Sequence, residues 1–212
     1  MSDPKQKYYE KRAQVLVKNL QNRHFEAYYC QTKESALEKA LELIPEGSSV
    51  GWGGALSAQQ IGLLDAVNNG PYEAIDRDKT STPAERDAAQ KRALLADYFI
   101  TGANALSIDG QMVNIDGNGN RVAAIIYGPK NVIVVAGMNK VVDSLDAAIV
   151  RARTVAAPMN KQRFALNTPC EVTGTCADCK SDGCICNQIV ITRNCKPTGR
   201  IKMIIVGEEL GF

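Results

Sequence analysis

Six of the seven cysteines in this chain of 212 residues lie between positions 170 and 195, and the seventh is Cys30. The six are Cys170, Cys176, Cys179, Cys184, Cys186 and Cys195, with the spacing C-x5-C-x2-C-x4-C-x-C-x8-C. Thiolates are ligands of zinc and of iron–sulfur clusters, and a C-x2-C step directs two of them at one ion. The flanking residues are mostly polar or turn-forming, so residues 168–196 are expected to wrap a bound group. We call this segment the cysteine loop.

Three kinds of site fit these thiols. A structural zinc would use Cys170, Cys176, Cys179 and one of Cys184 or Cys186. An iron–sulfur cluster would use the same four thiolates, although the C-x2-C-x2-C-x3-C-P run of bacterial ferredoxins is missing. Disulfides are favoured only in an oxidising compartment, and the N-terminal segment lacks the apolar stretch of a secretory signal. The pattern therefore favours a metal or cluster.

Composition narrows the classes of function. The apolar fraction of 45%, the charged fraction of 23% and the net charge of +2 are those of an ordinary globular protein. The basic residues are spread evenly, which argues against nucleic acid as a partner. No apolar run approaches the roughly 20 residues of a membrane span, so a cytoplasmic protein is expected. His24 is the single histidine, which makes histidine-dependent hydrolase chemistry improbable, and Cys30 is expected to be a small buried side chain.

Hydrophobic periodicity predicts alternating helices and strands. Helices are expected over 5–22, 33–44, 57–69, 83–96 and 143–156, and strands over 25–30, 48–52, 72–76, 98–101, 131–136, 189–192 and 201–206. Capping boxes are predicted at Ser57 and Thr82, and Pro158 is predicted to end the last helix. Two Asp-Gly pairs around 111–115 predict a hairpin or meander, whereas 122–126 fits helix or strand. The pattern predicts one α/β domain over 1–212, layered, with a mostly parallel sheet; Rossmann topology is the alternative.

A glycine-rich turn joins a predicted strand to a predicted helix. Gly51, Gly53, Gly54 and Ser57 would present backbone N–H groups to a phosphate or carboxylate. The dinucleotide pattern G-x-G-x-x-G would need glycine at position 56, where this chain has Leu56. The alternative is that these glycines only permit a tight turn and close packing.

A second polar group lies between apolar strands. Asn104 and Asn120 could hold a loop or a ligand through paired hydrogen bonds, and Arg121 could bind a carboxylate or phosphate with its fork. Asp109 is a candidate acid or base. Lys140 follows the most apolar strand, at the edge where open α/β sheets place ligands.

Several of these segments together resemble the LUD-domain family, over nearly the whole chain. They are Gly102-Ala103-Asn104-Ala105, Asp109-Gly110, Val113-Asn114-Ile115-Asp116-Gly117, Gly119-Asn120-Arg121-Val122-Ala123-Ala124, Tyr127-Gly128-Pro129, Gly137-Met138-Asn139-Lys140, Ala157-Pro158, the cysteine loop and Gly207-Glu208-Glu209-Leu210-Gly211-Phe212. The resemblance implies a fold similar to ribose-5-phosphate isomerase and CoA-transferase proteins. It also implies a bacterial cytoplasmic protein of lactate oxidation to pyruvate, working with iron–sulfur partner proteins.

The resemblance also implies a set of metal ligands. Matched position by position, the shared cysteines are Cys170, Cys176, Cys179 and Cys186. This chain departs from the family at Ile108, where relatives usually carry an acidic residue.

Two classes of function follow. The chain is expected to be a subunit of a lactate-oxidising assembly with iron–sulfur partners. Alternatively, it is an enzyme acting on a small phosphorylated or carboxylated metabolite, with Asp109 as acid or base and with Asn120, Arg121 and Lys140 as anchors.

Overall fold

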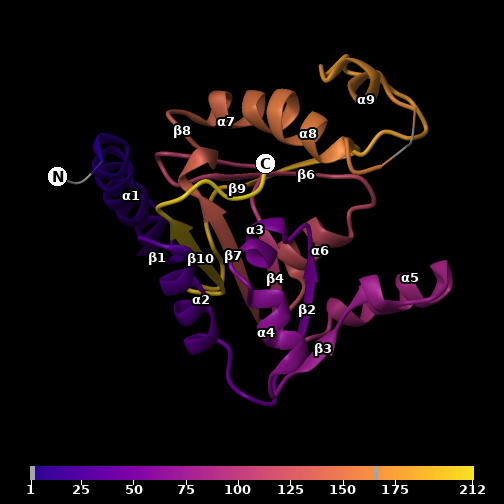
Figure 1. The fold of residues 1–212 in the computed structure, drawn as a ribbon, viewed down its shortest axis with the longest axis horizontal. Helices are drawn as coiled ribbons and strands as arrows, with labels where there is room; N and C mark the ends of the chain where they lie inside the picture. The colour runs from indigo at the N-terminus through magenta and orange to yellow at the C-terminus, as the bar shows by residue number, and fades with distance from the viewer. Residues whose placement is uncertain (1–2, 165–166) are drawn as a thin grey trace.

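A six-stranded sheet, parallel throughout, forms the centre of the molecule (Figure 1). The computed structural model describes residues 3–164 and 167–212. In spatial order the strands are β1 (Glu26–Cys30), β10 (Ile201–Val206), β7 (Asn131–Gly137), β4 (Tyr98–Gly102), β2 (Ser49–Gly53) and β3 (Glu73–Ile75). The predicted α/β class with a mostly parallel sheet is confirmed. Rossmann topology is wrong, because that fold has its first strand inside the sheet and here β1 is an edge strand.

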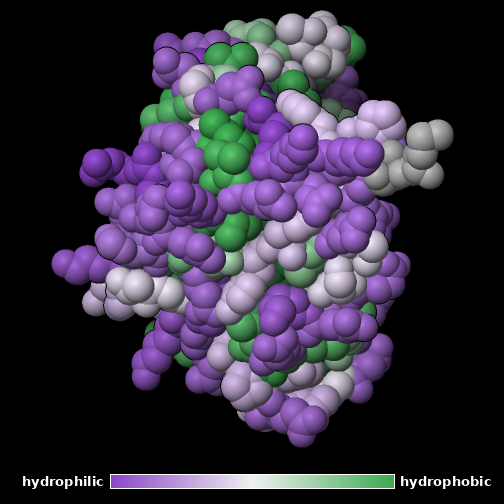
Figure 2. All heavy atoms as spheres, turned by 90° about the vertical axis from the view of Figure 1, so that its left-hand side faces the viewer, coloured by the Kyte–Doolittle hydropathy of each residue, from purple (hydrophilic) through white to green (hydrophobic). Residues whose placement is uncertain are grey.

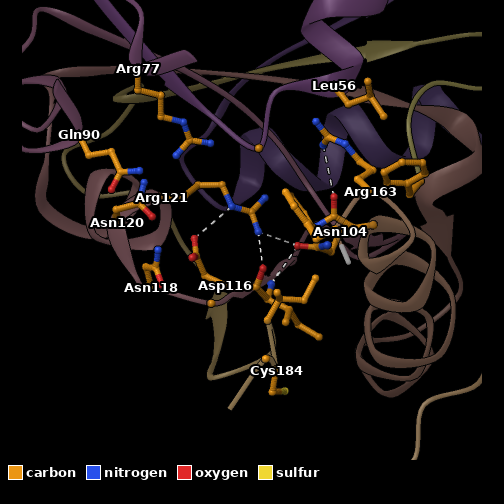
Figure 3. A pocket seen from close by; sticks show the side chains of 18 of the residues that line it. Leu56, Arg77, Gln90, Asn104, Asp116, Asn118, Asn120, Arg121, Arg163 and Cys184 are labelled. Carbon is orange, nitrogen blue, oxygen red and sulfur yellow. Dashed lines mark hydrogen bonds and ion pairs between the residues drawn. The ribbon is translucent and has the colours of Figure 1, made fainter. Parts of the chain in front are cut away.

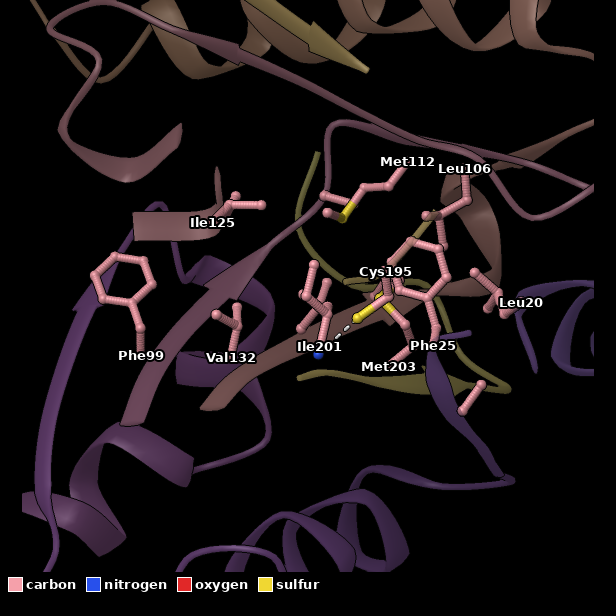
Figure 4. Close-up of a cluster of buried hydrophobic side chains, with 14 of the residues drawn as sticks. Leu20, Phe25, Phe99, Leu106, Met112, Ile125, Val132, Cys195, Ile201 and Met203 are labelled. Carbon is pink, nitrogen blue, oxygen red and sulfur yellow. Dashed lines mark hydrogen bonds between the residues drawn. The ribbon is translucent and has the colours of Figure 1, made fainter. Parts of the chain in front are cut away.

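Helices cover both faces of this sheet. Successive side chains of β7 point to opposite faces and are apolar on both, so both faces must be buried. Val132, Val134 and Ala136 pack in one apolar cluster, and Ile133 and Val135 pack in the other. The first cluster, seen in Figure 4, receives side chains from α1 (Pro4–Asn22), α5 (Pro83–Ala93) and α6 (Asn120–Tyr127). The second receives them from α2 (Lys33–Glu42), α3 (Leu56–Gln60) and α4 (Leu63–Asn69). Burial on both faces explains why β7 has an unbroken apolar sequence.

A second sheet lies across the carboxyl ends of the central strands, at the top of Figure 1. Its order is β8 (Val141–Val142), β5 (Ala105–Ser107), β6 (Met112–Asp116) and β9 (Gln188–Thr192). Strands β5 and β6 form the predicted hairpin, and β9 pairs antiparallel with β6. This sheet is covered by α7 (Leu145–Arg151) and a π-helical segment (Ala152–Ala156), which continues into α8 (Ala157–Lys161). The cysteine loop contains α9 (Pro169–Thr173), which follows α8 in the chain, and it includes β9.

Several predicted helix boundaries are wrong. The helix expected over 57–69 is two helices, because Gly62 between them has φ +82°. Ser57 is no N-cap, since α3 begins at Leu56 and the Ser57 side chain is buried. Pro158 does not end the last helix: the helical backbone continues from α7 through the π-helical segment into α8, and Pro158 lies in the first turn of α8. Residues 122–126 are helical, within α6.

Other predictions are confirmed. The capping box of Thr82 with Glu85 opens α5. Cys30 is buried, and so is Cys195, which lies in the core of Figure 4 and accepts a hydrogen bond of 3.3 Å from the Ile201 N–H. In Figure 2 the face that forms the left-hand side of Figure 1 is mostly hydrophilic, with a narrow hydrophobic strip. In the described part of the chain, no helix combines the length and the apolar character needed to cross a membrane.

Candidate functional site

A cavity of about 470 Å³ lies between the two sheets, where three adjacent central strands end (Figure 3). Gly54 follows β2, Asn104 follows β4 and Lys140 comes just after β7, so all three are at the carboxyl edge of the parallel sheet. The other walls come from β6, the start of α6, the end of α8 and the cysteine loop. Four arginines line this cavity, and we call it the arginine cavity. They are Arg77, Arg86, Arg121 and Arg163.

Arg121, at the start of α6, is held by the turn that precedes it. Its Nε donates to Asp116 Oδ2 at 3.3 Å, and its Nη2 donates to Asn104 Oδ1 at 2.9 Å and to the Ile115 carbonyl oxygen. The Arg121 and Asp116 side chains are only 11% and 9% exposed, and burial lowers the pKa of Arg121. Its Nη1 donates to no acceptor in the described part of the chain, which leaves one end of the fork available in a fixed position.

The glycine turn packs against this guanidinium. Gly54 has φ +58°, and a Cβ atom there would lie 2.7 Å from Arg121 Cδ and 2.9 Å from Nη1. A Cβ atom at Gly53 would lie 3.6 Å from Arg121 Cβ. Gly51 is different, because its backbone approaches Ala93 of α5, to which a Cβ would come within 2.6 Å. Of these predicted ligand-binding glycines, Gly54 lines the cavity, Gly53 packs behind it and Gly51 is a packing position.

Arg77 brings a second guanidinium with unused donors. Its Nε is buried and has no hydrogen-bond partner within the described residues, and the nearest carboxylate oxygen, of Asp78, is 4.0 Å away. Burial lowers the pKa of Arg77, the charge of Asp78 opposes this, and the charges of Arg86 and Arg163 lower it further. The cations of this wall therefore repel one another, and an anion between them would remove part of that cost.

Lys140 is buried at the inner end of the cavity. Its Nζ donates a hydrogen bond of 3.0 Å to Ser57 Oγ, and the Ser57 hydroxyl is 3.4 Å from the Leu210 carbonyl oxygen that accepts from it. Burial, together with the charges of Arg151 and Arg121, lowers the pKa of Lys140 to about 7. A large fraction of this amine is therefore neutral at physiological pH and carries a free lone pair.

The cysteine loop closes one side of the cavity. Asp182, Gly183, Cys184 and Ile185 belong to the wall. The loop is attached to the α7–α8 layer: Gln162 Nε2 donates to the Cys170 carbonyl oxygen at 3.0 Å, and Lys161 lies 3.7 Å from the Glu171 carboxylate. Arg153 and Asp178 form a further ion pair.

The thiols of this loop lie near one another without converging. All seven cysteines are free. Burial raises the pKa of Cys186 to about 12, and Cys184, Cys176 and Cys170 act on it in the same direction. Cys179 is hydrogen-bonded to Ser181 and Cys184. In the described ranges, no three or more histidine, cysteine, aspartate or glutamate side chains are arranged to hold a metal ion. The predicted ligands Cys170, Cys176, Cys179 and Cys186 therefore share one loop but do not fit a metal in this arrangement.

The structure separates the other predicted residues. Asn104, Asn120, Arg121 and Lys140 line the arginine cavity. Asp109 does not: it lies on the β5–β6 turn, where its Oδ2 accepts from Arg23 Nη2 at 2.9 Å and its backbone carbonyl accepts from Arg23 Nε at 2.6 Å. It joins the hairpin to the residue that follows α1.

Sequence reasoning missed part of the wall. Arg77, Arg86, Asn160, Arg163 and Phe164 line the cavity although they belong to segments far apart in the chain. No local pattern marks them, because tertiary packing alone brings these segments together.

Comparison with solved structures supports the fold. A crystal structure of a DUF162 family protein from Deinococcus radiodurans matches with a TM-score of 0.53 and 13% identity, over 93% of this chain and 97% of that one. Ribose 5-phosphate isomerase A from Neisseria gonorrhoeae matches with a TM-score of 0.34 and 19% identity, over 53% of this chain and 54% of that one. The isomerase from Methanocaldococcus jannaschii has a TM-score of 0.34 and 15% identity, over 53% and 55% of the two chains.

Sequence comparison identifies the family. No curated protein matches the chain. The model of the LUD domain matches residues 13–206, which include every central strand and the whole arginine cavity except Phe212. The chain belongs to the LUD-domain family.

Proposed function

We propose that this chain serves lactate utilization as a component that binds a small carboxylated or phosphorylated metabolite in the arginine cavity, beside iron–sulfur partner proteins. Family membership supports the connection to lactate utilization. The observation that carries the proposal is that Arg77 and Arg121 both line this cavity and that neither guanidinium uses all of its N–H donors within the described residues. Guanidinium groups bind carboxylates and phosphates with paired hydrogen bonds, which suits the carboxylates of lactate and pyruvate.

The position of the cavity supports the same proposal. Ligands of open α/β sheets bind outside the carboxyl ends of the strands, and β2, β4 and β7 all end here. Of the charged residues in the wall, Asp116 is neutralised by Arg121 and Arg86 lies 2.8 Å from Asp78. Arg77, Arg121 and Arg163 still outnumber Asp116 and Asp182, so the wall favours an anion.

Calorimetric titration of the purified chain with L-lactate, pyruvate and inorganic phosphate tests the binding. At least one of these anions is expected to bind, and Arg77→Gln should weaken it by about 10- to 100-fold, since a hydrogen bond to a charged group contributes roughly 1.5–3 kcal/mol. Arg92→Gln is the matched control, because Arg92 is exposed and pairs with Glu73 outside the cavity. Absence of heat with all three anions would overturn the proposal.

The subunit role has a separate test. Lactate-dependent reduction of an electron-accepting dye is measured with the iron–sulfur partner proteins, with and without this chain. The rate is expected to depend on the chain and to fall with Arg77→Gln. A rate that is the same without the chain would refute the subunit role.

One observation favours the second candidate, an enzyme that acts alone on the bound metabolite. Burial lowers the pKa of Lys140 to about 7, and strongly shifted pKa values are common among catalytic groups; Lys140 also lies in the cavity wall. Turnover of a 2-hydroxy acid or a phosphorylated sugar by the isolated chain would favour this candidate over the subunit.

A further inference from the structure

The two buried lysines of the described chain have different surroundings. Lys161 is fully buried and lies 3.7 Å from the Glu171 carboxylate, so its charge is compensated. Lys140 is 4% exposed, and no carboxylate of the described residues lies within ion-pair distance of it. Its one hydrogen bond within these residues goes to the Ser57 hydroxyl. Lys140 therefore forms no ion pair with a described residue, and burial of its charged form would cost free energy.

Two arginines, Arg151 and Arg121, act on the Lys140 amine through their charge. Arg151 donates to the carbonyl oxygens of Asn139 and Asn104, and Arg121 lies across the cavity wall. Both charges oppose protonation of Lys140. A lysine kept neutral by burial and by other cations is the form that attacks carbonyl carbons.

The amine and the arginine fork lie on two sides of one backbone contact. Gly102 N–H donates to the Gly54 carbonyl oxygen at 3.2 Å. A Cβ atom at Gly54 would lie 2.9 Å from Arg121 Nη1, and one at Gly102 would lie 3.9 Å from Lys140 Nζ. Both groups therefore lie next to the contact between Gly54 and Gly102, and both line the arginine cavity.

We infer that Lys140 forms an imine with a 2-oxo acid whose carboxylate is held by the arginines of the cavity. The inference rests on the proposed function, because the arginines must bind the anion. It adds the class of ligand and the covalent role of one residue. Ser57 is a positioning residue: it accepts an N–H of the amine, and so restricts the direction of the nitrogen lone pair.

The step needs no oxidant or reductant. The Nζ lone pair attacks the keto carbon, a C–N bond forms as the C=O π bond breaks, and one proton passes from nitrogen to the keto oxygen to give a carbinolamine. Nitrogen then loses its second proton as the C–O bond breaks, and one water molecule leaves. The products are the imine and water. The reaction is a condensation, and no atom is oxidised or reduced.

Borohydride trapping tests the inference on the intact chain. The protein is incubated with pyruvate, reduced with sodium borohydride, digested and mapped by mass spectrometry. The peptide with Lys140 is expected to gain the mass of pyruvate minus water plus two hydrogens. Lys140→Met should abolish this adduct, whereas Lys91→Arg, at an exposed lysine, should retain it. Because the adduct is located in the unaltered protein, a variant that fails to fold does not remove the test.

The outcomes separate the inference from the proposed function. Heat of binding with pyruvate, but no adduct at Lys140, overturns the imine and leaves anion binding intact. An adduct spread over exposed lysines, with no preference for Lys140, also overturns it. An adduct at Lys140 that decreases about tenfold in Arg77→Gln supports both. Absence of both heat and adduct overturns both.

Discussion

Lys140 Nζ lies 3.0 Å from Ser57 Oγ, and the two residues are 83 positions apart in the chain. Ser57 belongs to α3 and Lys140 follows β7, so the hydrogen bond joins the helix after the glycine turn to the end of β7. The Ser57 hydroxyl also donates to the Leu210 carbonyl oxygen, which brings in the segment after β10. A serine that would ordinarily cap a helix is thus placed inside the molecule, where it holds an amine.

Replacing Lys140 should change how stability depends on pH. The pKa of this lysine is 10.5 in its ordinary state and about 7 in the folded protein, mainly because of burial. Between these values the unfolded state binds a proton that the folded state does not, so the stability of the wild type rises with pH through this interval. Lys140→Met should therefore be more stable than the wild type at pH 7, by at most roughly 1.4 kcal/mol for each unit of the pKa difference. The advantage should shrink toward pH 10.5.

Urea unfolding at several pH values checks this. Lys91→Met, at an exposed position, should stay within about 0.5 kcal/mol of the wild type throughout. An advantage of Lys140→Met that is the same at both ends of the interval would show that the amine is protonated in the folded protein.

Gly54→Ala should weaken anion binding by displacing Arg121. The added Cβ would lie 2.7 Å from Arg121 Cδ, and the φ of +58° costs a non-glycine residue about 1–2 kcal/mol. Gly47→Ala is the matched control, because Gly47 has φ +79° and nothing within 4 Å of the Cβ position. Both variants should lose similar backbone stability in thermal unfolding. Only Gly54→Ala should lose affinity, by about tenfold or roughly 1.4 kcal/mol, in the calorimetric titration.

Asp109→Asn should affect stability and leave ligand binding unchanged. Burial raises the pKa of Asp109, but hydrogen bonds from Ser107 and Gln111 and the charge of Arg23 lower it more, and the net shift is downward. The stability that this carboxylate contributes is present above its ordinary pKa of 3.8 and is lost as pH falls through the lower folded value. The side chain is 46% exposed, so the loss at neutral pH should be within about 1 kcal/mol. A large fall in affinity for pyruvate would return Asp109 to the list of catalytic candidates.

The reduced protein, purified without oxygen, should bind metal through Cys170, Cys176, Cys179 and Cys186, as the family resemblance implies. Because these thiols do not converge in the structure, binding should rearrange the cysteine loop, driven by about 10 kcal/mol or more of binding free energy. Metal and sulfide analysis gives the result: brown protein with iron and sulfide indicates a cluster, and colourless protein with one zinc indicates a structural site.

Cys184→Ser is the control for this site and should retain the metal. Metal-free protein, together with Cys170→Ser and Cys176→Ser variants as stable as the parent, would rule the site out. Free thiols or disulfides would then account for these cysteines.

The sequence pattern predicted those helices and strands whose hydrophobic periodicity matches their burial in the folded protein. The apolar run of β7 predicted a central strand, and Lys140, predicted to follow it at the edge of the sheet, lines the arginine cavity there. The second sheet was not foreseen as a sheet, because β8 has 2 residues and β5 has 3, too few for a periodic pattern. Arg77 and Arg163 could not be predicted, because their position in one wall depends on how η1 (Arg77–Lys79) and the end of α8 pack.

The cysteine loop forms a wall of the cavity at residues 182–185, and this has a thermodynamic consequence. If the cavity binds an anion as we propose, then metal binding or oxidation of a thiol that moves this wall should change the affinity for that anion. The coupling must be reciprocal: the factor by which the loop alters anion affinity equals the factor by which the anion alters the equilibrium of the loop. A coupling of roughly 1–3 kcal/mol would change either equilibrium by about 5- to 150-fold. The concentration of the metabolite and the chemical state of the cysteines would then jointly determine how much anion the cavity binds.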